Sequence, residues 1–167
     1  MSELTSQVKK ISQLLPKIAR NLRVAPLIDE VKPGLTPSQL MVLLILKGTE
    51  TTPLPVGRLA QELAVSFPTI SGVVDRLCRE KLVERVASKD DRRLVLLRLS
   101  KEGKKVVDRL QKALEDLLQS VLEKMTEAEQ KAITKATETV FEFSLVLSKD
   151  VSKNVQKKKI ASQASLA

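Results

Sequence analysis

The sequence of 167 residues contains no histidine, tryptophan or tyrosine, and it has only three phenylalanines and one cysteine. Without histidine, the chain lacks the side chain that most often acts as a general base near neutral pH. A zinc site would have to combine one cysteine with carboxylates, which is outside the usual ligand sets. The aromatic platforms on which single-stranded nucleic acid stacks are also missing. These absences favour a binding protein over an enzyme, and we expect no cofactor and no metal.

The single cysteine, Cys78, excludes an internal disulfide, so a reducing compartment is the simpler setting. No signal-peptide pattern begins the sequence, and no apolar run approaches the roughly 18 residues that a membrane span needs. A chain of this length can bury a core without metals or disulfides. We therefore expect one globular domain in the cytoplasm, with no membrane partner.

Positive charge is in excess, since 29 Lys and Arg stand against 20 Asp and Glu, for a net charge of +9. The excess lies in residues 1–35, 56–100 and 149–167, whereas residues 36–55 are balanced and residues 101–148 are nearly neutral. A basic middle region suits a polyanion such as duplex DNA, because Lys and Arg bind phosphates with release of counterions. A soluble surface that happens to be basic explains the charge alone equally well.

Both ends of the chain show the three- and four-residue apolar spacing of amphipathic helices. In residues 4–25, Pro16 and Pro26 predict a kink or a late start rather than one straight rod. A helix so exposed at a chain end needs a partner surface, part of which we expect from a second subunit. Residues 1–35 and 101–148 are thus predicted to form a helical dimerisation region, and residues 149–167 a disordered basic tail.

The middle region, residues 36–100, predicts a different arrangement. Thr36 begins a helix with a capping box, and residues 40–46 are apolar on all sides, so this helix is expected to be buried centrally. A short helix that starts near Pro55 is joined by a four-residue turn to a helix capped by Ser66. Two short helices joined so tightly form a helix-turn-helix.

The hydrophobic period then changes from that of a helix to that of strands. Residues 82–86 and 94–99 are rich in Val and Leu and predict two strands, with the charged residues 87–93 between them. A β-hairpin directly after a helix-turn-helix is a wing. The predicted fold class is therefore mainly α (α+β): a winged helix-turn-helix with long terminal helices for dimerisation.

Several short motifs occur in the order and spacing of a known family. Over about residues 11–147 the chain resembles the MarR family of bacterial winged-helix regulators. The resemblance rests on Leu35-Thr36-Pro37-Ser38-Gln39, Leu59-Ala60, Val65-Ser66-Phe67-Pro68-Thr69-Ile70-Ser71, Val74-Asp75-Arg76-Leu77, Leu82-Val83-Glu84-Arg85, Asp91-Arg92-Arg93 and Leu99-Ser100-Lys101-Glu102-Gly103. It implies a symmetric homodimer that binds a pseudo-palindromic operator in double-stranded DNA, usually as a repressor relieved by a small ligand or an oxidant.

Three positions depart from the family pattern. Lys81 stands where a glycine is usual between the recognition helix and the wing, and we expect it to adopt a left-handed conformation. Ala64 stands where the turn often has glycine. Gly72 replaces a larger and often basic residue, which removes one possible contact to phosphate or base.

A recognition helix at about residues 66–79 is expected to enter the major groove by its N-terminal half. Its Ser66 side chain is explained more simply by capping than by DNA contact. Arg76 suits a phosphate, or an ion pair with Asp75 or Glu80. The candidate DNA-binding residues of this helix are Ser66, Phe67, Pro68, Thr69, Ser71, Gly72 and Arg76.

The wing, residues 87–93, supplies three further candidates: Lys89, Arg92 and Arg93. Arginine inserted into a narrow minor groove reads DNA shape. By resemblance, Arg92 is the residue that enters the groove, and Asp91 stabilises the wing by pairing with Arg93. The competing interpretation is a solvated, charged turn without a DNA contact.

Alternatives to this ligand-controlled repressor remain at this stage. Cys78 continues the buried stripe of its helix, which favours inert packing over a redox-responsive regulator. An effector pocket, for a small anionic or aromatic ligand, is expected by resemblance between the terminal helices and the winged helix, but no residue can be assigned to it. Because of Gly72, a winged-helix module that binds proteins and has lost specific DNA binding is also an alternative.

Overall fold

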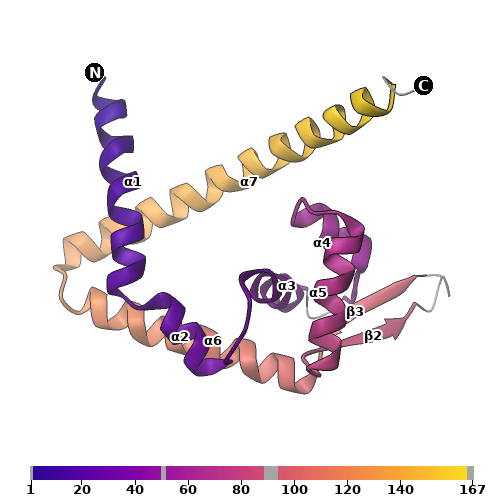
Figure 1. The fold of residues 1–167 in the computed structure, drawn as a ribbon. Coiled ribbons are helices and arrows are strands. Elements are labelled where there is room, and N and C mark those ends of the chain that lie inside the picture. Colours follow the sequence, from indigo (N-terminus) through magenta and orange to yellow (C-terminus); the bar gives the residue numbers. More distant parts are fainter. Residues whose placement is uncertain (1, 50–51, 89–93, 165–167) are drawn as a thin grey trace.

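The computed structural model describes residues 2–49, 52–88 and 94–164, with side chains up to residue 147. In the described chain a small sheet lies at one edge of a group of helices, and the two terminal helices extend away from the rest (Figure 1). In order, the elements are α1 (Glu3–Asn21), α2 (Val24–Val31), α3 (Pro37–Gly48), β1 (Leu54–Pro55), α4 (Val56–Glu62), α5 (Phe67–Arg79), β2 (Val83–Ala87), β3 (Val95–Leu99), α6 (Lys101–Leu122) and α7 (Glu127–Ala164).

One hydrophobic core joins the middle of the chain to the first half of α6. The three-stranded sheet is antiparallel in the order β1-β3-β2, and β2 pairs with β3 from Val83↔Leu99 to Ala87↔Val95. Helix α3 packs against α5, α6 and β3, and α5 packs against α4 and β2. The core side chains with the least exposure are Val42, Leu43, Leu46, Leu59, Ile70, Val74, Leu77, Leu82, Leu97, Val106 and Val107. This arrangement confirms the predicted winged helix-turn-helix.

Three predicted helix starts are also confirmed. Thr36 and Gln39 form a reciprocal capping box at the start of α3. The Ser66 hydroxyl accepts a hydrogen bond from the Thr69 amide, and the Ser100 hydroxyl accepts one from the Gly103 amide. Each cap satisfies a backbone N–H that the first turn of a helix leaves without a partner.

The N-terminal stripe divides into two helices, but the break is not at Pro16. Helix α1 continues through Pro16, and the chain turns at Arg23, whose φ of 53° is left-handed. Helix α2 then begins at Val24, with Pro26 in its first turn, where a missing N–H costs nothing.

The predicted disorder of residues 149–167 does not match the backbone, since α7 continues as a helix to Ala164. The physical reason is local: residues 149–164 contain no glycine or proline to end the helix, and they are rich in Lys, Gln and Ala, which favour it. Residues 165–167 lie outside the described chain.

The apolar sequence of α3 predicted a helix buried on all sides, but the structure leaves part of its surface exposed. Val42, Leu43 and Leu46 are buried, whereas Met41 and Leu44 are 46% and 45% exposed. The reason is tertiary, because the sheet, α5 and α6 contact α3 and the core takes up only part of its apolar surface.

Helix α6 begins in direct contact with the turn between α5 and β2. The Ser100 hydroxyl donates to the Lys81 carbonyl at 2.6 Å, and the Ser100 amide donates to the Leu82 carbonyl at 3.0 Å. Lys81 has a φ of 58°, which confirms its predicted left-handed conformation. A Cβ on Gly103 would lie 1.9 Å from the Leu82 oxygen, so only glycine fits there.

Replacing Gly103 with alanine is expected to lower the free energy of unfolding by about 1–3 kcal/mol, the usual cost of overpacking a tight contact. Gly72→Ala is the matched control, because a Cβ on Gly72 meets nothing within 4 Å in the described structure. That control is expected to gain about 0.5–1 kcal/mol from the lower backbone entropy of the unfolded chain. Urea denaturation monitored by circular dichroism measures both, and equal effects of the two substitutions would contradict the assignment.

Candidate nucleic-acid interface

The helix-turn-helix is closed by a tight turn between α4 and α5. The Val65 amide donates to the Ala60 carbonyl at 3.0 Å, and Ala64 adopts a left-handed φ of 53°. Ala64 therefore takes the conformation for which the family often uses glycine. The turn brings the start of α5 to the surface.

The first turns of α5 expose the residues that the sequence predicted for DNA contact. Ser66, Pro68, Thr69 and Gly72 are exposed, and Phe67 is 58% exposed. Their helix is anchored by the opposite face, which is buried in the core through Ile70, Val74 and Leu77. Ser71 is only half-buried. Six of the seven predicted recognition-helix residues are thus exposed; all but Arg76, which lies in the last turn of α5, are at the N-terminal end of the helix.

The two hydroxyls at the start of α5 hydrogen-bond to each other. Ser66 Oγ and Thr69 Oγ1 are 2.7 Å apart, and the Thr69 amide donates to Ser66 Oγ at 3.3 Å. Ser66 therefore has the capping role favoured from the sequence.

An ion pair links the recognition helix to the first strand of the wing. Arg85 Nη2 of β2 lies 2.5 Å from Asp75 Oδ1 of α5. The sequence left two roles open for Arg76, a phosphate contact or an ion pair with Asp75 or Glu80; in the structure Asp75 pairs with Arg85, and Glu80 pairs with Lys32. Arg76 forms no ion pair with any residue that the structure describes, so its guanidinium is available to a phosphate.

A second polar network links the end of α5 to α2 and α3. The buried amide of Gln39 donates from Nε2 to Glu80 Oε1 at 3.2 Å, while its Oε1 accepts from the amide and the hydroxyl of Thr36. The other Glu80 oxygen lies 3.3 Å from Lys32 Nζ, at the end of α2. Glu80 thus bridges elements more than 40 positions apart, which no local spacing in the sequence indicates.

The hairpin emerges from this base, but its tip is not described. The Ser88 amide donates to the Leu94 carbonyl at 3.3 Å, and Glu84 of β2 pairs with Arg98 of β3 across the hairpin at 2.9 Å. The predicted wing contacts Lys89, Arg92 and Arg93, and the predicted wing-stabilising Asp91, lie outside the described residues.

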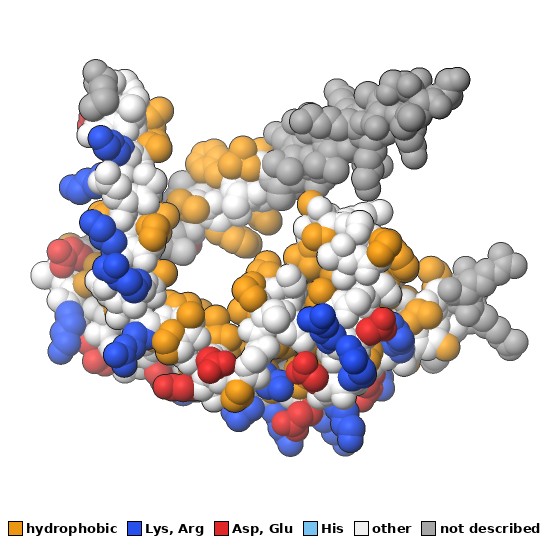
Figure 2. All heavy atoms as spheres, in the orientation of Figure 1, with side chains coloured by type: hydrophobic (Ala, Val, Ile, Leu, Met, Phe, Trp, Pro, Cys, Tyr) orange, Lys and Arg blue, Asp and Glu red, His pale blue; other side chains and the backbone are white. Residues whose placement is uncertain are grey.

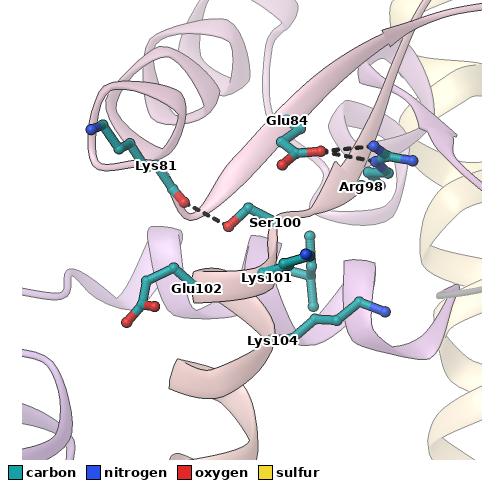
Figure 3. Close-up of a pocket in the computed structure, with 8 residues that line it drawn as sticks. Lys81, Glu84, Arg98, Ser100, Lys101, Glu102 and Lys104 are labelled. Carbon is teal, nitrogen blue, oxygen red and sulfur yellow. Dashed lines mark hydrogen bonds and ion pairs between the residues drawn. The ribbon is translucent and has the colours of Figure 1, made fainter.

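A pocket of about 550 Å³ lies at the base of the hairpin, beside the start of α6 (Figure 3). The charged groups around it are partly paired, as Glu84 with Arg98 and Glu102 with Lys105. This place differs from the space between the terminal helices and the winged helix, where the resemblance implies an effector. The lining residues are Lys81, Glu84, Arg98, Leu99, Ser100, Lys101, Glu102 and Lys104.

Two further kinds of feature are absent from the described residues. No described helix is both long and apolar enough to cross a membrane. Within the same residues, no three His, Cys, Asp or Glu side chains come together as metal ligands would.

Cys78 lies on α5, partly buried and packed against the core. Burial raises the pKa of its thiol, and the Asp75 carboxylate acts in the same direction, while the Arg85 guanidinium lowers the pKa. A raised pKa reduces the thiolate fraction near neutral pH, and the thiolate is the reactive form. The environment of Cys78 therefore favours packing over redox sensing.

Alkylation of Cys78 by iodoacetamide is expected to rise with pH around a midpoint above that of the same thiol in the urea-unfolded chain. Arg85→Gln should move this midpoint further upward, because the substitution removes the cation that lowers the pKa. Mass spectrometry of the native protein against pH measures the rate without ambiguity, since the chain has one cysteine. A native midpoint below the unfolded one would contradict the structure.

Exposed apolar side chains line the terminal helices. Helix α1 has no buried residue, and none of residues 127–147 of α7 is buried. Figure 2 shows apolar side chains on both helices bordering a hollow. The large exposed apolar residues of these helices are Leu4, Val8, Ile11, Leu14, Leu15 and Ile18 on α1, and Ile133, Val140, Phe141, Phe143, Leu145, Val146 and Leu147 on α7.

Comparison with known proteins identifies this architecture. Residues 34–94 match the model of the MarR family. The chain has a winged helix-turn-helix fold, and over residues 34–94, less than half of its length, it is similar to the MarR family. The resemblance found in the sequence motifs is thereby confirmed.

Individual proteins similar to this chain extend the likeness beyond the winged helix. The HTH-type transcriptional regulator YfiV of Bacillus subtilis is 28% identical over 103 residues, which span 62% of this chain and 63% of that protein. The crystal structure of RV1404 from Mycobacterium tuberculosis has a TM-score of 0.72 at 28% identity, and the match covers 81% of this chain and 92% of RV1404. A MepR variant of S. aureus, bound to an oligodeoxyribonucleotide, has a TM-score of 0.59 at 25% identity over 81% of this chain and 97% of MepR.

Proposed function

We propose that this protein is a transcriptional regulator of the MarR family that binds a pseudo-palindromic operator in duplex DNA. The observation that carries the proposal is the exposed N-terminal end of α5, with Phe67, Pro68 and Thr69 at the surface and Arg76 unpaired among the described residues. A helix presented in this way fits the major groove by its N-terminal half. The MepR variant of similar fold is bound to an oligodeoxyribonucleotide, which supports DNA as the partner.

The working protein in this proposal is a homodimer. Residues 1–35 and 101–148 supply the dimerisation region, and residues 36–100 supply the DNA-binding region. The support is the apolar surface of α1 and α7, which water covers in the single chain and which a second copy would bury. Two-fold symmetry would then place two recognition helices on two half-sites.

Within each half-site, α5 reads the major groove and the wing reaches the minor groove. Arg92 enters the groove, Arg93 and Lys89 contact phosphates, and Asp91 holds the loop through Arg93. Ser66 keeps its capping role and positions the helix end. A small effector that relieves binding would occupy the hollow that the apolar side chains of α1 and α7 border.

Titration of duplex DNA binding against salt tests the proposal. Each Lys or Arg that contacts a phosphate releases counterions. The logarithm of the binding constant should therefore fall steeply and linearly with the logarithm of the salt concentration. A module that binds proteins and has lost its operator would show little affinity for duplex DNA at any salt. That result would overturn the proposal.

Arg92→Ala is expected to weaken operator binding by about 1–3 kcal/mol, the scale of one specific DNA contact, with an unchanged melting temperature. Arg98→Ala is the matched control, because Arg98 lies at the base of the same hairpin and pairs with Glu84. Fluorescence anisotropy at one salt concentration compares the two variants. Equal affinities of the Arg92 variant and the wild type would refute the groove contact.

Ile11→Glu is expected to shift the protein from dimer to monomer, because it places a charge in a surface that dimerisation would bury. Ile11 is 56% exposed in the single chain, so the substitution should leave the fold intact. Lys10→Glu, which changes charge outside the apolar stripe, should leave the dimer in place. Sedimentation velocity measures both, and a wild-type chain that sediments as a monomer at micromolar concentration would contradict the proposed assembly.

A further inference from the structure

The groove-facing end of α5 has an unusual chemistry for a DNA-reading helix. Its first two turns, residues 67–72, contain no Arg, Lys, Asn, Gln, Asp or Glu. The exposed positions are an aromatic ring at Phe67, a proline ring at Pro68, Thr69, and a bare backbone at Gly72. The side chains that form bidentate hydrogen bonds with bases are therefore absent from the part of the helix that would lie deepest in the groove.

Contacts within the protein also engage the polar groups at this end of α5, so that fewer of them remain for hydrogen bonds with bases. The Thr69 hydroxyl is 2.7 Å from the Ser66 hydroxyl, which itself accepts the Thr69 amide. Asp75, the nearest carboxylate along the helix, is held by Arg85. Ser71 is half-buried. What remains exposed is mainly apolar: the Phe67 ring, the Pro68 ring and the Thr69 methyl.

Each base presents a different group in the major groove. Guanine is read by Arg or Lys, adenine by Asn or Gln, and cytosine by a carboxylate, whereas thymine offers a 5-methyl group to apolar side chains. Of these four partners, only the thymine methyl matches the exposed apolar end of α5. Phe67 is 58% exposed in the single chain, so contact with such a methyl would remove apolar surface of both groups from water.

We infer that α5 selects its half-sites through thymine 5-methyl groups, with Phe67 as the main specificity-determining residue and with Pro68 and the Thr69 methyl beside it. The inference rests on the proposed DNA-binding function and adds the chemical class of sequence that is read. Arg76 and the basic wing supply affinity for phosphates and do not distinguish thymine from uracil.

The first experiment determines the preferred sequence and then removes its methyl groups. The full-length chain selects binders from a random 30-base-pair duplex library, and each thymine of the recovered half-site is replaced by uracil, which keeps the base pair and loses the methyl. One or two positions facing α5 should each lose about fourfold in affinity, as for the burial of one methyl-sized group. At those positions, replacing the T·A pair by 5-methylcytosine·G should bind more tightly than replacing it by unmethylated C·G, because the methyl returns to the same place.

The second experiment assigns the methyl contact to its side chain. Phe67→Ala should abolish the difference between thymine and uracil at one position, so that both duplexes bind equally. Arg76→Ala is the matched control on the same helix: it should weaken both duplexes by the same factor and keep their ratio. Urea denaturation of both variants checks that each is folded, which is expected because Phe67 and Arg76 are exposed.

The outcomes separate the inference from the proposed function. Tight, salt-dependent binding without any effect of uracil substitution would overturn the thymine inference and leave the regulator intact. A uracil effect that persists in the Phe67→Ala variant would overturn the role of Phe67. Absence of duplex binding in the selection would overturn both.

Discussion

The winged helix depends on one close contact, between the start of α6 and the turn that follows α5. There the Ser100 side chain and amide hold the carbonyls of Lys81 and Leu82, and Gly103 lets the α6 backbone approach Leu82 without a Cβ. The same short segment ends the recognition helix, starts β2 and precedes the wing. A shift at this point would therefore move the recognition helix and the hairpin relative to each other, and both would lose their common alignment on DNA.

Polar contacts also fix the position of α5 relative to the neighbouring elements. Asp75 and Arg85 tie the middle of α5 to β2, while Glu80 ties its end to Gln39 and Lys32. The Asp75–Arg85 pair is half-exposed, and its free-energy contribution is expected to be small because solvent screens it. The pair instead fixes the orientation of α5 relative to β2. The Glu80 bridge is partly buried and connects the recognition helix to α2, the element that adjoins α1.

The distribution of apolar surface divides the chain into two kinds of helix. Helices α3 and α5 bury one face in a core that belongs to the chain itself, whereas α1 and α7 leave their apolar faces in water. A helix such as α1, with a strong apolar stripe and no buried residue, is stable in isolation only marginally. The middle of the chain thus buries its own apolar side chains, whereas the terminal helices can bury theirs only against another surface. This difference is the physical basis of the proposed dimer.

Helix caps, the strand periodicity and the motif order were readable from the sequence because each depends on residues within a few positions of one another. Thr36, Ser66 and Ser100 begin their helices as expected, and the left-handed Lys81 follows from its position between helix and strand. The exposed end of α5 was predictable for the same reason, since its buried face has a clear period. The chain end after residue 148 was misjudged because composition describes disorder only coarsely, while helix propensity without glycine or proline extends α7.

By itself, then, the sequence determined the elements, their caps and the chemical character of the recognition helix, all of which are local properties. Only the tertiary structure decided which face of α3 is buried, that Asp75 pairs with Arg85 and not with Arg76, and that Glu80 joins Gln39 to Lys32. The tertiary structure also explains the glycine at position 103, because the backbone of α6 there lies too close to the Leu82 carbonyl for any Cβ. These features depend on the approach of segments distant along the chain, and such approach is set by the packing of the whole core.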